Sequence, residues 1–268
     1  MSTDEKEVKL SADISILPLK RESHTLRFRL LQARDPDDPV LPEERQAFAT
    51  RLGVDLEQIE SCVLVGREVS WQDAAEGVDA VLVGGSGAYS VTDGHPWIDA
   101  FVRTLAGLAD NKVPVFASCF GFQGLVLALG GDVRGDSEAA EVGSFELECL
   151  PEAKQDPLFE ALPTNFFAQE GHKDRAFTLP SRAINLVQSN RCPYQAIKVK
   201  EAPVYATQFH PELTGEENCA RFRRYEKGYR AALGDDVTDQ IMRDFRESPE
   251  ANRLLLRFME LLQEGKLR

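Results

Sequence analysis

A short apolar segment that ends at a single cysteine constrains the fold of this chain most. Residues 113–118 read Val-Pro-Val-Phe-Ala-Ser, a run typical of a buried strand, and an apolar helical pattern follows Cys119 at once. Ala117 precedes the cysteine and Gly121 follows it, and a tight strand-to-helix turn needs such small neighbours. That turn would place the sulfur in a cleft at a helix N-terminus, where the pKa of a cysteine falls toward the reactive thiolate. The segment predicts a nucleophile at Cys119, and a buried core cysteine is the alternative.

A second strand-like run lies in the other half of the chain. Residues 203–212 read Pro-Val-Tyr-Ala-Thr-Gln-Phe-His-Pro-Glu and deliver His210 and Glu212 at their end. In extended backbone, residues two apart face the same way at roughly 6.5 Å, so the carboxylate can orient the imidazole. Pro211 stiffens the pair. The run predicts a general base together with its orienting partner.

These two runs resemble those of the class I, or triad, glutamine amidotransferases. The resemblance covers about residues 26–213 and is carried by the elbow at Cys119, the Gly-x-Gln that ends at Gln123, and the closing Gln-Phe-His-Pro-Glu run. It implies a flavodoxin-like α/β sandwich and hydrolysis of a γ-glutamyl amide. By this resemblance Cys119 is the nucleophile, His210 the base and Glu212 its orienting partner, and Gln123 positions the substrate.

The elbow departs from the family pattern at two positions. Family members usually carry glycine where this chain has Ala117, and histidine where it has Phe122. Neither change removes a catalytic group, but both leave open the branch of the family to which the chain corresponds.

A glycine-rich segment, residues 84–90, follows the predicted strand 79–83 directly. The dinucleotide-binding pattern G-x-G-x-x-G fails here, because counting from Gly85 its last position is a serine. In the family that the chain resembles, this loop supplies one backbone N–H of the oxyanion hole, and the residue after the cysteine supplies the other. The resemblance therefore assigns Gly85 and Phe120, with Gly87 as a neighbouring candidate, and a plain turn is the alternative.

Residues 166–174 resemble the family segment in which a histidine and an acid flank the glutamine pocket. His172 is expected to line this pocket. An inert histidine and a rival to His210 as base are the alternatives, but His172 lacks the H-x-E arrangement.

Predicted strands at residues 26–33, 61–65 and 79–83 alternate with helical patterns such as 42–53, which indicates a mainly parallel sheet covered on both faces. The predicted architecture is a flavodoxin-like three-layer sandwich with a C-terminal helical extension. Its divisions are a loose lead-in over residues 1–24, with a possible strand at 14–19, an amidotransferase-like domain over 25–213 and helices over 214–268. Helical patterns are expected at 215–233, 238–245 and 249–265, the last with Ser248 as its N-cap.

Charge and cysteine content exclude several classes of protein. The formal net charge of −13, from 31 basic and 44 acidic residues, argues against a nucleic-acid partner. Five widely spaced cysteines without a C-x-x-C pair argue against a disulfide framework and a structural zinc site. The charged first residues lack the apolar core of a signal peptide, and no apolar run approaches membrane-spanning length, so we expect a cytoplasmic protein that does not interact with membranes.

The sequence leaves three functional hypotheses open. The first is a glutaminase subunit that feeds ammonia to a separate synthetase, because no Walker-type loop is present. The second is a free-standing γ-glutamyl peptide hydrolase, and the third is a catalytically silent binding protein on the same fold. No metal or redox cofactor is expected for either enzyme. The C-terminal helices are expected to pack back on their own domain, and a partner or homodimer surface is the alternative.

Overall fold

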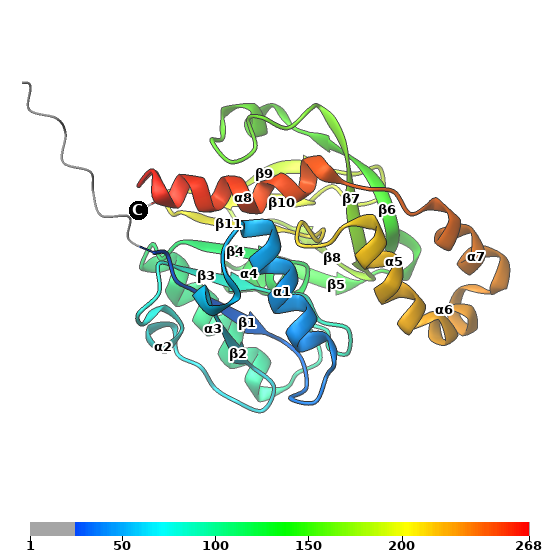
Figure 1. The fold of residues 1–268 in the computed structure, drawn as a ribbon, viewed down its shortest axis with the longest axis horizontal. Helices are drawn as coiled ribbons and strands as arrows, with labels where there is room; N and C mark the ends of the chain where they lie inside the picture. Colours follow the sequence, from blue (N-terminus) through cyan, green and yellow to red (C-terminus); the bar gives the residue numbers. More distant parts are fainter. Residues whose placement is uncertain (1–24, 268) are drawn as a thin grey trace, which may run out of the picture.

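The computed structural model describes residues 25–267, so the strand expected at 14–19 lies outside the described part of the chain. A central mixed sheet runs through the molecule in the order β2-β1-β3-β4-β11-β10-β9-β6-β7, with helices on both of its faces (Figure 1). The predicted three-layer α/β sandwich is thereby confirmed.

The parallel half of the sheet carries the predicted elbow. Its neighbouring strands all run in the same direction, and their carboxyl ends meet at one edge. In spatial order they are β2 (Ile59–Val63), β1 (Phe28–Gln32), β3 (Ala80–Val83), β4 (Val115–Ser118) and β11 (Val204–Thr207). Four of these strands, β1, β3, β4 and β11, are almost wholly buried, as strands in parallel sheets covered on both faces are.

The other half of the sheet is antiparallel. It comprises β10 (Ala196–Val199), β9 (Ala183–Gln188), β6 (Glu141–Cys149) and β7 (Asn165–His172). A separate two-stranded sheet, β5 (Asp132–Gly135) with β8 (Asp174–Thr178), was not expected from the sequence. Because β8 follows β7 after a single residue, this small sheet helps to fix the turn that contains His172.

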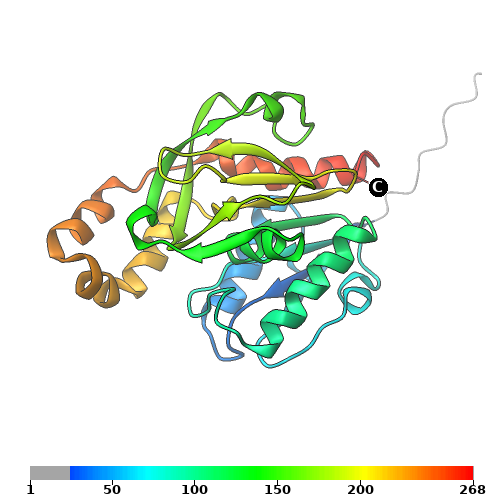
Figure 2. The same ribbon diagram turned by 180° about the vertical axis from the view of Figure 1, so that it is seen from behind.

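Two groups of helices cover the sheet. On one face lie α2 (Trp71–Ala75), α3 (Pro96–Asp110) and α4 (Phe120–Ala128), and on the other lie α1 (Val40–Leu52) and α8 (Pro249–Gln263) (Figures 1 and 2). The C-terminal helix α8 belongs to the core, since its apolar stripe is buried and the Phe258 ring meets Phe116 of β4 edge to face. Within residues 25–267, three short 3₁₀ turns lie at Leu56–Gln58, Ser137–Ala139 and Pro151–Gln155.

The segment before α8 forms an arm of helices that extends from one end of the molecule (Figure 1). The single helix expected at 215–233 is two helices, α5 (Gly215–Arg224) and α6 (Glu226–Leu233), which meet at Tyr225, and α7 (Asp235–Asp244) follows. Ser248 stands at the N-cap of α8 as expected, but no capping bond from its side chain forms. Its hydroxyl instead accepts a hydrogen bond from Gln169 of β7, which anchors the start of α8 to the sheet.

No helix in the described residues is long and apolar enough to span a bilayer.

Candidate active site

Cys119 occupies a strained turn between β4 and α4. Its backbone φ of 48° and ψ of −99° lie outside the regions that side-chain-bearing residues favour. Gly121 is required here, because a Cβ on it would lie 2.7 Å from Val83 and 2.9 Å from Ala117. The Cys119 amide donates to the Thr207 carbonyl at 2.8 Å and ties the elbow to the end of β11. The predicted strand, turn and helix around Cys119 are confirmed.

His210 and Glu212 lie in a turn after β11 rather than in extended strand as expected, because the strand ends at Thr207. This turn brings Nδ1 of His210 to 2.6 Å from Oε1 of Glu212. The His210 amide donates to the Gln169 carbonyl at 2.8 Å, and the Asn252 side chain of α8 donates at 2.8 Å to the carbonyls on either side of Glu212. The C-terminal helix therefore holds the turn that carries Glu212 in place.

The charges of the three side chains support one another. Burial alone would lower the pKa of His210, but the carboxylate of Glu212 and the negative charge of Cys119 raise that pKa to about 10. Burial opposes ionisation of Glu212, yet His210 and then Arg221 hold the pKa of this carboxyl below its usual value. The site thus favours an imidazolium between the Glu212 carboxylate and the Cys119 sulfur.

The glycine-rich loop after β3 lies against both His210 and Cys119. A Cβ on Gly85 would come within 2.7 Å of His210 Cε1 and 3.6 Å of Cys119 Cβ, so only glycine allows this approach. Phe120 is the first residue of α4, where no intrahelical acceptor exists for its N–H. Gly87 lies farther out, beneath the Tyr225 hydroxyl. This packing favours Gly85 over Gly87 as the loop donor beside the sulfur.

Two buried glutamines lie beneath Cys119. The Gln123 amide nitrogen donates to the Asp174 carbonyl at 2.8 Å and to Gln208 Oε1 at 3.2 Å. The Gln208 amide nitrogen in turn lies 3.7 Å from Cys119 Sγ. Gln123 lines the cavity, but its amide nitrogen is already engaged inside the protein. Gln208 has no assigned role from the sequence, although it is part of the Gln-Phe-His-Pro-Glu run.

His172 also lines the cavity, with both ring nitrogens facing acceptors. Nδ1 lies 3.1 Å from the Asp174 carbonyl oxygen, and Nε2 lies 3.1 Å from Glu141 Oε2 and 3.4 Å from Glu170 Oε2. Neither oxygen of the fully buried Glu170 has a hydrogen-bond partner. Burial, and next the charge of Glu141, raise the pKa of Glu170 well above its usual value, so this side chain is held as the neutral acid.

One group of described residues has the donor set of a metal site. Atoms of Glu141, His172 and Cys192 lie within 4.8 Å of one another. Both oxygens of Glu141 already accept hydrogen bonds, one from Ser189 and the other from Gln195 and His172. This hydrogen-bond network accounts for the arrangement without an ion.

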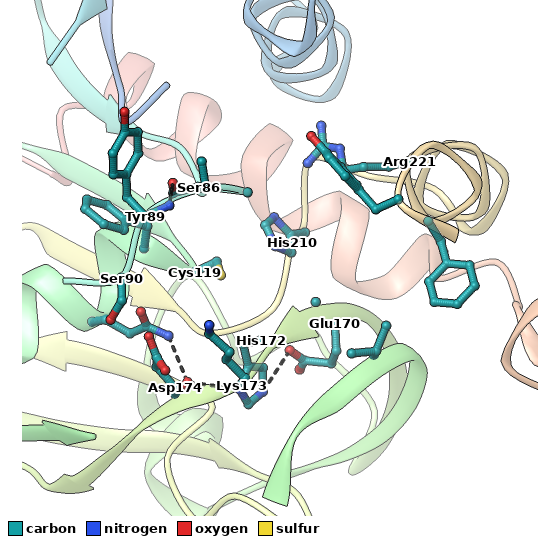
Figure 3. Close-up of a pocket in the computed structure, with 18 of the residues that line it drawn as sticks. Ser86, Tyr89, Ser90, Cys119, Glu170, His172, Lys173, Asp174, His210 and Arg221 are labelled. Atoms are coloured by element: carbon teal, nitrogen blue, oxygen red, sulfur yellow. Dashed lines mark hydrogen bonds and ion pairs between the residues drawn. The ribbon is translucent and has the colours of Figure 1, made fainter. Parts of the chain in front are cut away.

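A cavity of about 470 Å³ joins these groups (Figure 3). Cys119, Gln123, His172 and His210 line it, as do residues to which the sequence motifs assigned no role. On the His172 side they are Glu170, Lys173 and Asp174, on the loop side Ser86, Tyr89 and Ser90, and on the helical arm Arg221, Phe222, Tyr225 and Tyr229. The arm residues lie outside the two runs that carried the resemblance, and their amphipathic helical pattern does not distinguish a pocket wall from a solvated helix.

The model of the glutamine amidotransferase class-I family matches residues 50–224. Among curated proteins, one subunit of the glutamine-hydrolyzing GMP synthase of Methanococcus aeolicus is 33% identical over 130 residues, which is 48% of this chain and 67% of that one. The glutamine-hydrolyzing GMP synthase of Thermosipho africanus is 33% identical over 135 residues, or 50% of this chain and only 24% of that protein. The matched segment therefore spans about a quarter of this longer relative.

Solved structures share the fold. A glutamine amidotransferase from Thermotoga maritima superposes with a TM-score of 0.66 at 19% identity, covering 90% of this chain and 99% of the other. A glutamine amidotransferase from Methylobacillus flagellatus superposes with a TM-score of 0.67 at 18% identity, covering 90% of this chain and 96% of the other. With a family match over most of its length and this fold, the chain belongs to the class-I glutamine amidotransferases.

Proposed function

We propose that this chain hydrolyses the γ-carboxamide of glutamine, or of a γ-glutamyl amide, through a thioester on Cys119. The observation that carries the proposal is the arrangement of Cys119 on its strained elbow with the buried His210–Glu212 pair, joined at 2.6 Å, beside it. A nucleophile, a base and an orienting acid in this relation are what acyl transfer from an amide requires.

The reaction begins when the Cys119 thiolate attacks the amide carbon. The amide oxygen becomes an oxyanion, and the N–H groups of Gly85 and Phe120 are its proposed donors. As the carbon–nitrogen bond breaks, His210 gives its proton to the departing nitrogen, and a γ-glutamyl thioester and a free amine result. His210 then takes a proton from water, whose oxygen attacks the thioester and releases glutamate and the thiolate.

The opposite wall of the cavity suits the α-amino group of a glutamyl substrate. The Glu170 and Asp174 carboxyl groups line the cavity, and neither accepts a hydrogen bond from any side chain in the described residues. An ammonium group placed here would pair with Asp174 and favour ionisation of Glu170. His172 and Gln123 serve this wall by fixing the Asp174 backbone, from which they are 3.1 and 2.8 Å away.

A glutaminase subunit that passes ammonia to a separate synthetase is a second candidate function. The observation that favours it is that several relatives are named as one subunit of a glutamine-hydrolyzing GMP synthase. In that case hydrolysis of glutamine by this chain alone would be slow and would increase when the synthetase binds.

The test measures glutamate release from L-glutamine and from γ-glutamyl peptides by the purified protein and by Cys119→Ala. We expect Cys119→Ala to lose at least about 10³-fold of the activity, and a diazo-ketone analogue of glutamine to label Cys119 alone, as located by peptide mass spectrometry. Cys149, a buried cysteine outside the cavity, is the internal control for labelling. Glutamate release that persists in Cys119→Ala would refute the proposal.

A further inference from the structure

The first two helices of the arm form a fixed wall of the cavity rather than a loose appendage. Helix α5 begins with a capping box in which Thr214 and Glu217 exchange hydrogen bonds. The buried Asn218 amide then donates to backbone carbonyls of β6 and β7, those of Gly143 and Glu170. Arg221 lies three residues beyond Asn218, on the same side of the helix, and lines the cavity.

Arg221 has no acidic partner among residues 25–267, although the protein carries 44 acids against 31 basic residues. Two other arginines of the arm are paired: Arg224 binds Glu43 at 2.8 Å, and Arg230 binds Glu226 at 2.7 Å. Arg221 is close enough to the base to lower the pKa of Glu212, yet it forms no ion pair with that carboxylate. Its half-buried guanidinium is therefore available to a ligand in the cavity.

Arg221 lies on the side of the cavity where one part of the substrate, the group on the departing nitrogen, would bind. The departing nitrogen must lie next to His210, because His210 supplies its proton. In Figure 3 Arg221 lies on the His210 side of the cavity, and Lys173 and Asp174 lie on the other side of Cys119. A substituent on the departing nitrogen would extend toward Arg221, and the glutamyl part would extend toward Asp174.

The cavity has room for such a substituent. Its 470 Å³ falls in the range of about 300–1,000 Å³ typical of pockets for molecules much larger than one amino acid. Tyr225 lines this end, and its hydroxyl oxygen is 3.3 Å from where a Cβ on Gly87 would lie. The Tyr229 and Phe222 rings add apolar surface. Ammonia, the leaving group of glutamine, would use none of these groups.

We infer that this end of the cavity is a leaving-group subsite, in which Arg221 binds the carboxylate of an amino acid released from a γ-glutamyl peptide. The inference rests on the proposed function and names its substrate class. Arg221 forms a charge-assisted hydrogen bond to that carboxylate, and Tyr225, at the junction of α5 and α6, and Tyr229 of α6 contact the side chain of the released residue.

The test compares two substrates that differ only in one charge, γ-glutamyl-alanine and γ-glutamyl-alaninamide. We expect kcat/KM of the wild-type protein to be higher for the acid than for the amide. Arg221→Met should lower kcat/KM for the acid by on the order of 10- to 100-fold more than for the amide, which is the loss expected for one charge-assisted hydrogen bond. Arg221→Lys should recover part of the preference.

Arg223→Met is the matched control, because Arg223 is exposed on the same helix and does not line the cavity. Arg223→Met should leave kcat/KM unchanged for both the acid and the amide substrate. An equal loss on the two substrates in Arg221→Met would overturn the inference, since it would show that Arg221 acts through Glu212. Hydrolysis of glutamine alone, dependent on Cys119, would also overturn it while leaving the proposed function intact. Absence of any Cys119-dependent release would refute both.

Discussion

Under the proposed function, His210 has to hold a proton until the amine departs, and its surroundings favour this. Its pKa of about 10 means that the imidazolium persists through neutral pH. The folded state binds this proton more tightly than the unfolded chain, whose histidine titrates near the ordinary value of 6.5. The stability that this proton contributes is therefore complete below about pH 6.5 and is lost as the pH rises to about 10.

Glu212→Gln should move the alkaline limb of kcat/KM to lower pH. In the wild-type protein we expect this limb near pH 10. Without the carboxylate the pKa of His210 should fall by about one unit or more, because the negative charge that stabilises the imidazolium is lost. His95→Gln, which changes an exposed histidine outside the cavity, should leave the limb where it is. An unchanged limb in Glu212→Gln would contradict the assigned pair.

At the scale of elements, helices and strands whose apolar pattern has clear ends could be predicted from the sequence. Hydrogen bonds between distant segments could not. The helix expected at 42–53 is α1, which ends as predicted at Gly53 with a φ of 70°. The break at Tyr225 has no proline or glycine to signal it, and β5 carries too few apolar residues to stand out. For the site, the sequence predicted which residues follow the buried strands β4 and β11. The turn that holds His210 and Glu212, the arm residues and the contact from Asn252 depend on packing between distant segments.

Asn252→Ala should weaken the turn that carries Glu212. It removes two hydrogen bonds, each 2.8 Å long, to the carbonyls of Pro211 and Leu213. We expect a free energy of unfolding lower by about 1–3 kcal/mol and a reduced kcat, since Glu212 would no longer be held against His210. Chemical denaturation and glutamate release measure the two effects. Arg253→Ala, at the adjacent exposed position, should show neither, and equal effects in both variants would mean that α8 acts only by packing.

For the whole molecule, the dominant electrostatic property is its excess of negative charge. At a net charge of −13 the acidic groups repel one another, and this repulsion lowers the stability of the compact state. The ion pairs of the arm, such as Arg230 with Asp239 at 2.6 Å, offset only part of it.

Added salt should therefore raise the melting temperature at neutral pH. Sodium chloride at about 0.5 M screens charges beyond a few ångströms, so the repulsion between acidic groups should diminish. The same salt should have much less effect near pH 4.9, where the net charge is close to zero. Differential scanning calorimetry measures both conditions. An equal rise at the two pH values would show that salt acts through apolar burial instead.

The pairing of β4 with β11 has a consequence for the protein during its own synthesis. The two strands are neighbours in the sheet, yet the ribosome makes Cys119 well before His210 and Glu212, and Asn252 later still. A growing chain therefore carries the cysteine without the base that would let it turn over an amide. Under the proposed function, hydrolysis begins only when translation has passed Glu212 and β11 has entered the sheet, so chains that end before His210 do not consume the cell's glutamine.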